Sequence, residues 1–85
     1  MIELYVVFGD FSVKEAENEN WEEVARIFED SPNTIIKRVF ETEAEAYAYR
    51  CGLKDADGWL SAYPLLDEEV ELLSKHISLE DIEQP

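Results

Sequence analysis

Cysteine, glycine and basic residues are scarce in this chain. Its 85 residues include one cysteine, three glycines and seven lysine and arginine residues. The single cysteine, Cys51, excludes an intrachain disulfide and a thiolate metal cluster. The glycines, Gly9, Gly52 and Gly58, are isolated from one another, which excludes a glycine-rich phosphate-binding loop.

The few basic residues are outnumbered by 21 acidic ones, so the net charge is -14. Nucleic-acid binding depends on lysine and arginine displacing counterions from phosphates, and anionic membrane surfaces repel acidic proteins. We therefore expect no direct binding to nucleic acid and none to a membrane. The N-terminal segment MIELYVVFGDF has no basic lead and only a short apolar run, which predicts neither a signal peptide nor a membrane span. Together with the single cysteine, this favours a cytoplasmic protein.

Disorder is not expected despite the charge, because 46% of the residues are hydrophobic. A chain of this length has room for one core, so residues 1–85 should form a single domain. The C-terminal segment, residues 78–85, is acidic, and we expect it to form a loose tail.

Three segments have the β-branched and aromatic composition of strands, namely residues 2–8, 34–40 and 59–66. Pro64 has no N–H to donate to a neighbouring strand, which predicts an edge position for the third segment. Residues 9–19 are ambiguous. Gly9-Asp10 could turn a hairpin, but KEAENEN lacks strand character and favours an acidic loop.

Three further segments show helical spacing of apolar residues. A helix is expected to follow Asn20, whose side chain could form a capping box with Glu23, and to stop before Pro32. A second helix is expected over residues 43–55, capped by Thr42 with Glu45, and a third from Asp67. The residues predicted to face the core are Trp21, Val24, Ala25 and Phe28 in the first helix, Ala44, Tyr47, Ala48 and Cys51 in the second, and Val70, Leu73 and Ile77 in the third.

The elements therefore alternate as β-α-β-α-β-α. This order predicts a small α/β (or α+β) domain, in which helices pack on a single layer of about three strands. If residues 34–40 and 59–66 were adjacent and parallel, their connection should be right-handed.

The sequence DADG at 55–58 resembles part of a calcium-binding loop. Placing Gly58 at the sixth position of such a loop puts Asp55 and Asp57 at correct ligand positions. The first and twelfth positions then fall on Leu53 and Pro64, which cannot supply carboxylates. We therefore predict no metal site, and we interpret Gly58 as the residue that ends the preceding helix.

No residue set predicts catalysis. Cys51 and His76 are the one possible nucleophile–base pair, but Cys51 lies on an apolar helical stripe and His76 near a helix end. Adjacent carboxylates could in principle serve acid–base catalysis, but in so acidic a chain they are expected from the composition alone. We expect a non-enzymatic protein with no catalytic residues and no cofactor.

Four aromatic residues are candidates for binding a partner, namely Tyr5, Tyr49, Trp59 and Tyr63. If helices cover only one face of the sheet, Tyr5, Trp59 and Tyr63 form an exposed patch on the other face. If Tyr47 faces the core, Tyr49, which lies about 200° around the helix from it, faces solvent or a partner. The alternative is that a helix, for example residues 68–77, covers them.

These features favour a small acidic protein-binding module, which docks on a partner with a basic surface through its carboxylates and exposed aromatic side chains. One alternative is an inhibitor that mimics DNA and occupies the site of a nucleic-acid-binding protein. Another is a homodimeric structural module that binds itself. The carboxylates could also serve solubility alone.

Overall fold

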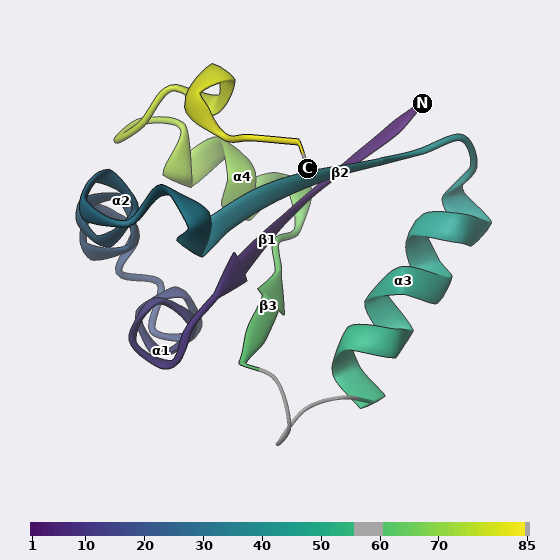
Figure 1. Ribbon diagram of the computed structural model, residues 1–85, viewed down its shortest axis with the longest axis horizontal. Helices are drawn as coiled ribbons and strands as arrows, with labels where there is room; N and C mark the ends of the chain where they lie inside the picture. The colour runs from purple at the N-terminus through teal and green to yellow at the C-terminus, as the bar shows by residue number, and fades with distance from the viewer. Residues whose placement is uncertain (56–60, 85) are drawn as a thin grey trace.

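The computed structural model describes residues 1–55 and 61–84, which form a three-stranded sheet with helices on both faces. The mixed α/β class predicted from the sequence is confirmed (Figure 1). Along the chain the elements are β1 (Ile2–Phe8), α1 (Asp10–Glu17), α2 (Trp21–Asp30), the 3-10 turn η1 (Pro32–Thr34), β2 (Ile35–Phe40), α3 (Glu43–Asp55), β3 (Ala62–Pro64), α4 (Asp67–Leu73) and the 3-10 turn η2 (Leu79–Asp81).

The first strand is the centre of the sheet, whose order is β2-β1-β3. Both neighbours are antiparallel to β1, and Val6 lies opposite Ile36 on one side and Pro64 on the other. β2 and β3 therefore run parallel to each other but are separated by β1. The edge position predicted from Pro64 is confirmed, because the proline lies in the outer strand β3.

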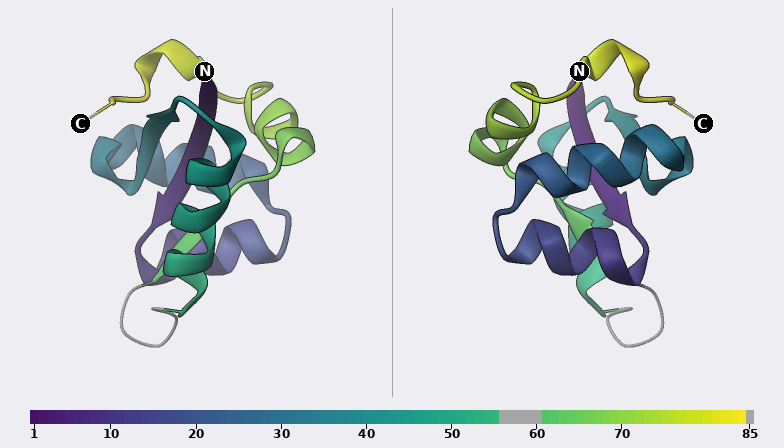
Figure 2. Two further views of the ribbon diagram at one scale, coloured as in Figure 1. Left: turned by 90° about the vertical axis from the view of Figure 1, so that its right-hand side faces the viewer. Right: turned by 90° about the vertical axis from the view of Figure 1, so that its left-hand side faces the viewer.

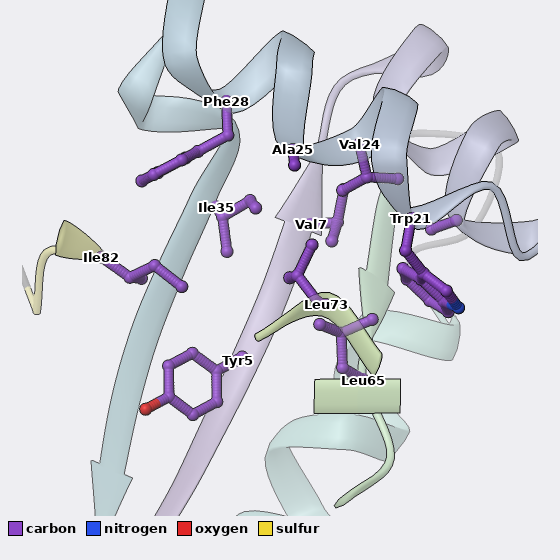
Figure 3. Close-up of a cluster of buried hydrophobic side chains, with 11 residues drawn as sticks. Tyr5, Val7, Trp21, Val24, Ala25, Phe28, Ile35, Leu65, Leu73 and Ile82 are labelled. Carbon is purple, nitrogen blue, oxygen red and sulfur yellow. The ribbon is translucent and has the colours of Figure 1, made fainter. Parts of the chain in front are cut away.

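Side chains of β1 alternate between two cores, as expected for a strand buried on both faces. Leu4 and Val6 point toward α3 and form a small cluster with Leu53. Tyr5 and Val7 point the other way. They belong to the larger cluster, which holds Ala16, Trp21, Val24, Ala25, Phe28, Ile35, Leu65, Leu73 and Ile82 (Figure 3).

The two faces are covered unequally. Figure 1 shows α3 alone on one side of the sheet, with α1, α2 and α4 on the other. The rotated views agree: α3 lies in front of the sheet in one and α1 and α2 in the opposite one (Figure 2). The order β-α-α-β-α-β-α thus places three helices against the larger core and one against the smaller.

The expected acidic loop over residues 9–19 is wrong, and so is the hairpin alternative, because this segment contains α1. Gly9 has a φ of 96°, a conformation that suits glycine and turns the chain from β1 into the helix. Within α1, Ser12 and Ala16 are buried one turn apart. These two small side chains give a weak hydrophobic period, and Lys14 and Glu15 between them are good helix formers.

The first predicted helix is confirmed as α2, and its predicted core stripe from Trp21 to Phe28 is buried. The capping box predicted for this helix, between Asn20 and Glu23, is wrong. The Asn20 side chain donates a hydrogen bond to Glu15 at 2.8 Å instead, and the Glu23 carboxylate accepts from Arg26. The chain leaves the helix at Ser31, before Pro32, as predicted.

Helix α3 has the predicted bounds, but the face that it buries is opposite to the predicted one. The Glu45 N–H donates to the Thr42 hydroxyl at 3.2 Å, so the predicted cap is confirmed. The buried residues are Ala46 and Leu53, whereas Tyr47 is 69% exposed. Residues 46, 49, 50 and 53 have the same helical spacing as the predicted stripe 44, 47, 48 and 51, and packing on Leu4 and Val6 selects the former.

The described part of the C-terminal segment, residues 78–84, is packed rather than loose. After α4 the chain forms η2 and then buries Ile82, which is 4% exposed, in the larger core. The backbone N–H of Lys37 in β2 donates to the carbonyl of Glu83 at 2.9 Å. The tail therefore covers part of the β2 edge, which otherwise offers unpaired backbone groups.

Candidate binding surfaces

Charge is divided unequally between the two sides of the sheet. Residues 10–34 and 65–84, which form α1, α2, α4 and the two 3-10 turns, carry 15 acidic and 3 basic residues, a net charge of -12. The remaining residues carry 6 acidic and 4 basic residues, a net charge of -2. We call the side built by α1, α2 and α4 the acidic side.

None of the 15 acidic residues of the acidic side is buried. Both salt bridges within the described residues involve Arg26, which contacts Glu23 and, at 3.6 Å, Asp30. The hydrogen bond from Arg26 lowers the pKa of Glu23. Arg26 is thus the ion-pair partner of two carboxylates. The other carboxylates of this side form no salt bridge with the described residues, and their field extends into solvent.

A groove of about 500 Å³ runs along the outer edge of β3. Arg50 and Lys54 of α3 line one wall, and Glu17 of α1 and Glu69 of α4 line the other, so the two walls have opposite charge. Ala62, Tyr63 and Pro64 contribute from the strand. The remaining lining residues are Val13, Tyr47, Cys51, Leu53 and Leu66.

Tyr63, one of the predicted partner-binding residues, is partly buried in this groove and tied to α4. Its hydroxyl donates a hydrogen bond to the Glu69 carboxylate at 2.7 Å. The other oxygen of Glu69 accepts from the N–H of Leu66 at 2.9 Å and so caps the helix. The hydrogen bond to Glu69, burial and the nearby carboxylates of Glu17 and Glu19 raise the pKa of Tyr63 to about 12.

The raised pKa of Tyr63 leads to a testable pH dependence. Because the folded protein favours the neutral phenol, the stabilisation is complete below the ordinary tyrosine pKa of 10.0 and is lost as the pH rises toward about 12. We expect Glu69→Gln to lower the pKa of Tyr63 toward 10.0, since the charged acceptor is removed. Phenolate absorbance during alkaline titration measures this, and Tyr63→Phe identifies the transition. A transition of Tyr63 that does not move in Glu69→Gln contradicts the assignment.

The exposed aromatic patch expected on the sheet is wrong at Tyr5. This side chain is 7% exposed and lies in the larger core, covered by the helices of the acidic side (Figure 3). Its hydroxyl donates to Glu3 at 3.4 Å, and burial, with the neighbouring Glu3, raises the pKa of Tyr5. The alternative, in which a helix covers this face, holds here. Trp59 lies outside the described residues.

Tyr49 is also turned inward rather than toward solvent. Its ring packs against Phe40 with centroids 5.3 Å apart, and the Arg38 guanidinium lies 6.0 Å from its centroid. The aromatic side chains that the structure exposes are instead Tyr47 and Phe11, at 69% and 83%. Phe11 was not predicted to be exposed on a helix, because residues 9–19 were expected to form a loop. Tyr47 was predicted to be buried, because the wrong one of two equivalent helical stripes was assigned to the core.

The possible catalytic pair is not assembled. Cys51 lies on α3, whereas His76 follows α4 and lines a separate hollow with Glu22, Arg26 and Glu29 of α2, on the other side of the sheet. Among residues 1–55 and 61–84 no group of three histidine, cysteine or acidic side chains is placed to hold a metal ion. Asp55 is the last residue of α3, and Asp57 and Gly58 lie outside the described residues. None of the helices in the described part of the chain combines the length and apolar character needed to cross a bilayer.

Comparisons with protein-family models, curated proteins and solved structures found no match to this chain. Three features of the described structure bear on function: the acidic side, the groove beside β3 and the exposed face of α3.

Proposed function

We propose that this chain is a small, non-enzymatic protein-binding module that docks on a basic partner surface through its acidic side. The observation that supports this most strongly is the division of charge, with -12 of the total -14 on the side formed by α1, α2 and α4. A surface that serves solubility alone can mix both signs over all faces. Here the cations are sparse on one side, and the repulsion among its carboxylates is relieved when a cationic surface approaches.

Exposed apolar groups on the same side supply contacts that electrostatics does not. Phe11 follows Asp10 at the start of α1 and is 83% exposed, and Leu72 of α4 is 39% exposed. Large apolar side chains act as anchors when a partner removes them from water, while surrounding charges steer the encounter. The module would therefore associate rapidly at low salt and retain a smaller, salt-independent component of affinity.

The same division of charge supports one alternative, an inhibitor that mimics DNA. An inhibitor of this kind displays its carboxylates along one side, where they replace backbone phosphates in the site of a nucleic-acid-binding protein. The two hypotheses differ in one result. If the chain mimics DNA, double-stranded DNA should displace it from its partner. If the partner does not bind nucleic acid, double-stranded DNA should leave the complex intact.

We expect partner capture to depend on the acidic side and not on net charge alone. Glu22→Gln/Glu29→Gln/Glu71→Gln removes three exposed carboxylates from that side and should weaken binding about tenfold, at the usual strength of exposed ion pairs. The matched control, Glu41→Gln/Glu43→Gln/Asp55→Asn, changes net charge equally on the α3 side and should bind as the wild type does. The measurement is retention of partners on the immobilised chain across a salt series.

Two results would oppose the proposal. One is retention that is indifferent to salt, because docking through exposed carboxylates is screened by ions. The other is an equal loss of binding in the two triple variants, which would mean that total charge, rather than the acidic side, governs retention.

A further inference from the structure

The outward face of α3 has the residue pattern of a packed face but is not packed. Ala44, Tyr47, Ala48 and Cys51 recur at the spacing of one helical stripe, typical of a helix that buries this side. Ala44 and Ala48 are exposed, Tyr47 is 69% exposed and Cys51 is partly buried. The sheet covers the other side of the helix (Figure 2). The buried residues of the helix are Ala46 and Leu53.

The surface around Tyr47 combines a protruding ring with hollows. The groove of about 500 Å³ beside β3 lies on one side of Tyr47 and Arg50. A second, shallower hollow of about 540 Å³ lies on their other side, lined also by Ile2, Glu43, Ala44 and Ala46. A protrusion next to a hollow allows a surface to be complementary to itself, as a two-fold symmetric interface requires.

The charges along α3 change sign from one end to the other. Glu43 and Glu45 lie in its first turn, whereas Arg50 and Lys54 lie in its second half. Neither of these cations forms a salt bridge with the described residues. Glu43 lies on the same flank of the helix as Arg50 and Lys54, so a second α3 running in the opposite direction would place its two cations near Glu43, and the reverse contact would form at the other end.

We propose that this face of α3 binds the α3 of a second copy of the chain, in an antiparallel arrangement with the two-fold axis near Ala48. This register brings Ala44 of one copy opposite Gly52 of the other. A Cβ built on Gly52 would meet nothing within 4 Å, so the backbone is open to close approach there. Tyr47 of each copy then fills a hollow beside the α3 of its partner.

The charges favour a second copy over an unrelated partner. A uniformly acidic or basic protein would complement one half of α3 and oppose the other half, whereas an antiparallel copy complements both. Repulsion between two chains of charge -14 is also smallest here, because the α3 side carries -2 and the acidic sides point away from each other. The inference goes beyond the proposed function and does not depend on it, since the two surfaces lie on opposite sides of the sheet.

Sedimentation velocity over a concentration series tests the dimer directly. We expect the wild-type mass to rise to that of two chains, and Ala48→Glu to raise the dissociation constant at least 30-fold, roughly the effect of losing a hot-spot contact. Leu72→Glu, which adds the same charge to an exposed site on α4, should leave the dimer unchanged. A wild-type monomer at every concentration, or equal effects of the two variants, would overturn the proposal.

The antiparallel register has its own test. Lys54→Glu should weaken the dimer about threefold, the effect of an exposed charge pair, and Glu43→Lys/Lys54→Glu should restore it. In a Cys51→Ser background, Ala48→Cys should form a disulfide-linked dimer on mild oxidation, because the two sulfurs meet near the axis, whereas Leu72→Cys should not. Failure of the charge swap to restore association, or equal cross-linking from both positions, would rule out this arrangement.

Discussion

Leu73→Ala is expected to lower the free energy of unfolding by about 3 kcal/mol, the usual cost of removing a large buried aliphatic side chain. Leu73 is the last residue of α4 and has no exposed surface. It belongs to the larger core, with Tyr5 and Val7 of the central strand (Figure 3). Alanine at this position leaves a cavity between α4 and the sheet. Equilibrium unfolding in urea measures the loss.

The neighbouring residue provides the matched control. Leu72 is the same residue type in the same helix but is 39% exposed. Leu72→Ala should cost under about 1 kcal/mol, since less apolar area returns to water and no cavity forms. Equal losses from the two substitutions would mean that α4 does not pack on the sheet through Leu73. Its carboxylates would then not be held on the acidic side.

The second large effect is expected at Ile82, in the segment whose sequence predicts a loose tail. Ile82→Ala should lower the free energy of unfolding by about 2–4 kcal/mol, because the side chain is 4% exposed in the larger core. Ile82→Asp should cost more, since a carboxylate would be buried without a partner. Thermal and urea unfolding, followed by circular dichroism, measure both variants.

Glu83→Ala is the control for Ile82, because its side chain is exposed while its backbone carbonyl still accepts from Lys37. We expect a change within about 0.5 kcal/mol, as for other surface substitutions. A stable Ile82→Ala protein would instead show that the tail is dispensable. The β2 edge would then lose its cover without unfolding of the domain.

The two proposed surfaces together describe a molecule with a distinct role for each side of the sheet. The near-neutral α3 side would join two copies, and the acidic sides would face outward. A partner that displays two basic patches would then bind with an affinity raised by effective concentration. The triple carboxylate variant and Ala48→Glu separate these roles, since each should affect one surface and leave the other intact.

Elements whose local pattern was unambiguous were predicted correctly from the sequence. The strand at residues 2–8 has apolar residues on both faces, and the structure buries both. The stripe from Trp21 to Phe28 indicated the correct face of α2, because no other stripe of that helix is apolar. Pro64 placed β3 at the edge, since a proline cannot donate a hydrogen bond to a further strand.

The candidate sites were less predictable, because they depend on contacts between distant segments. Tyr5 and Tyr49 are of a residue type that is common in binding sites. Helices cover Tyr5, however, and Phe40 packs against Tyr49. Helix α1 has only two fully buried residues, the small Ser12 and Ala16, with Val13 partly buried beside them, so its period was too weak to recognise. The groove beside β3 joins residues from α1, α3 and α4, and no local pattern relates them.

Composition and local periodicity were sufficient to establish the net charge and the α/β class. Two features relevant to function depended on the packed structure. Packing against the apolar side chains of β1 determined which of the two equivalent stripes of α3 is buried. Tyr47 lies on the other stripe and is exposed. The concentration of carboxylates on one side arose because three of the four helices in the described residues pack on the larger core. A position along the chain does not reveal which face of a sheet its helix will cover.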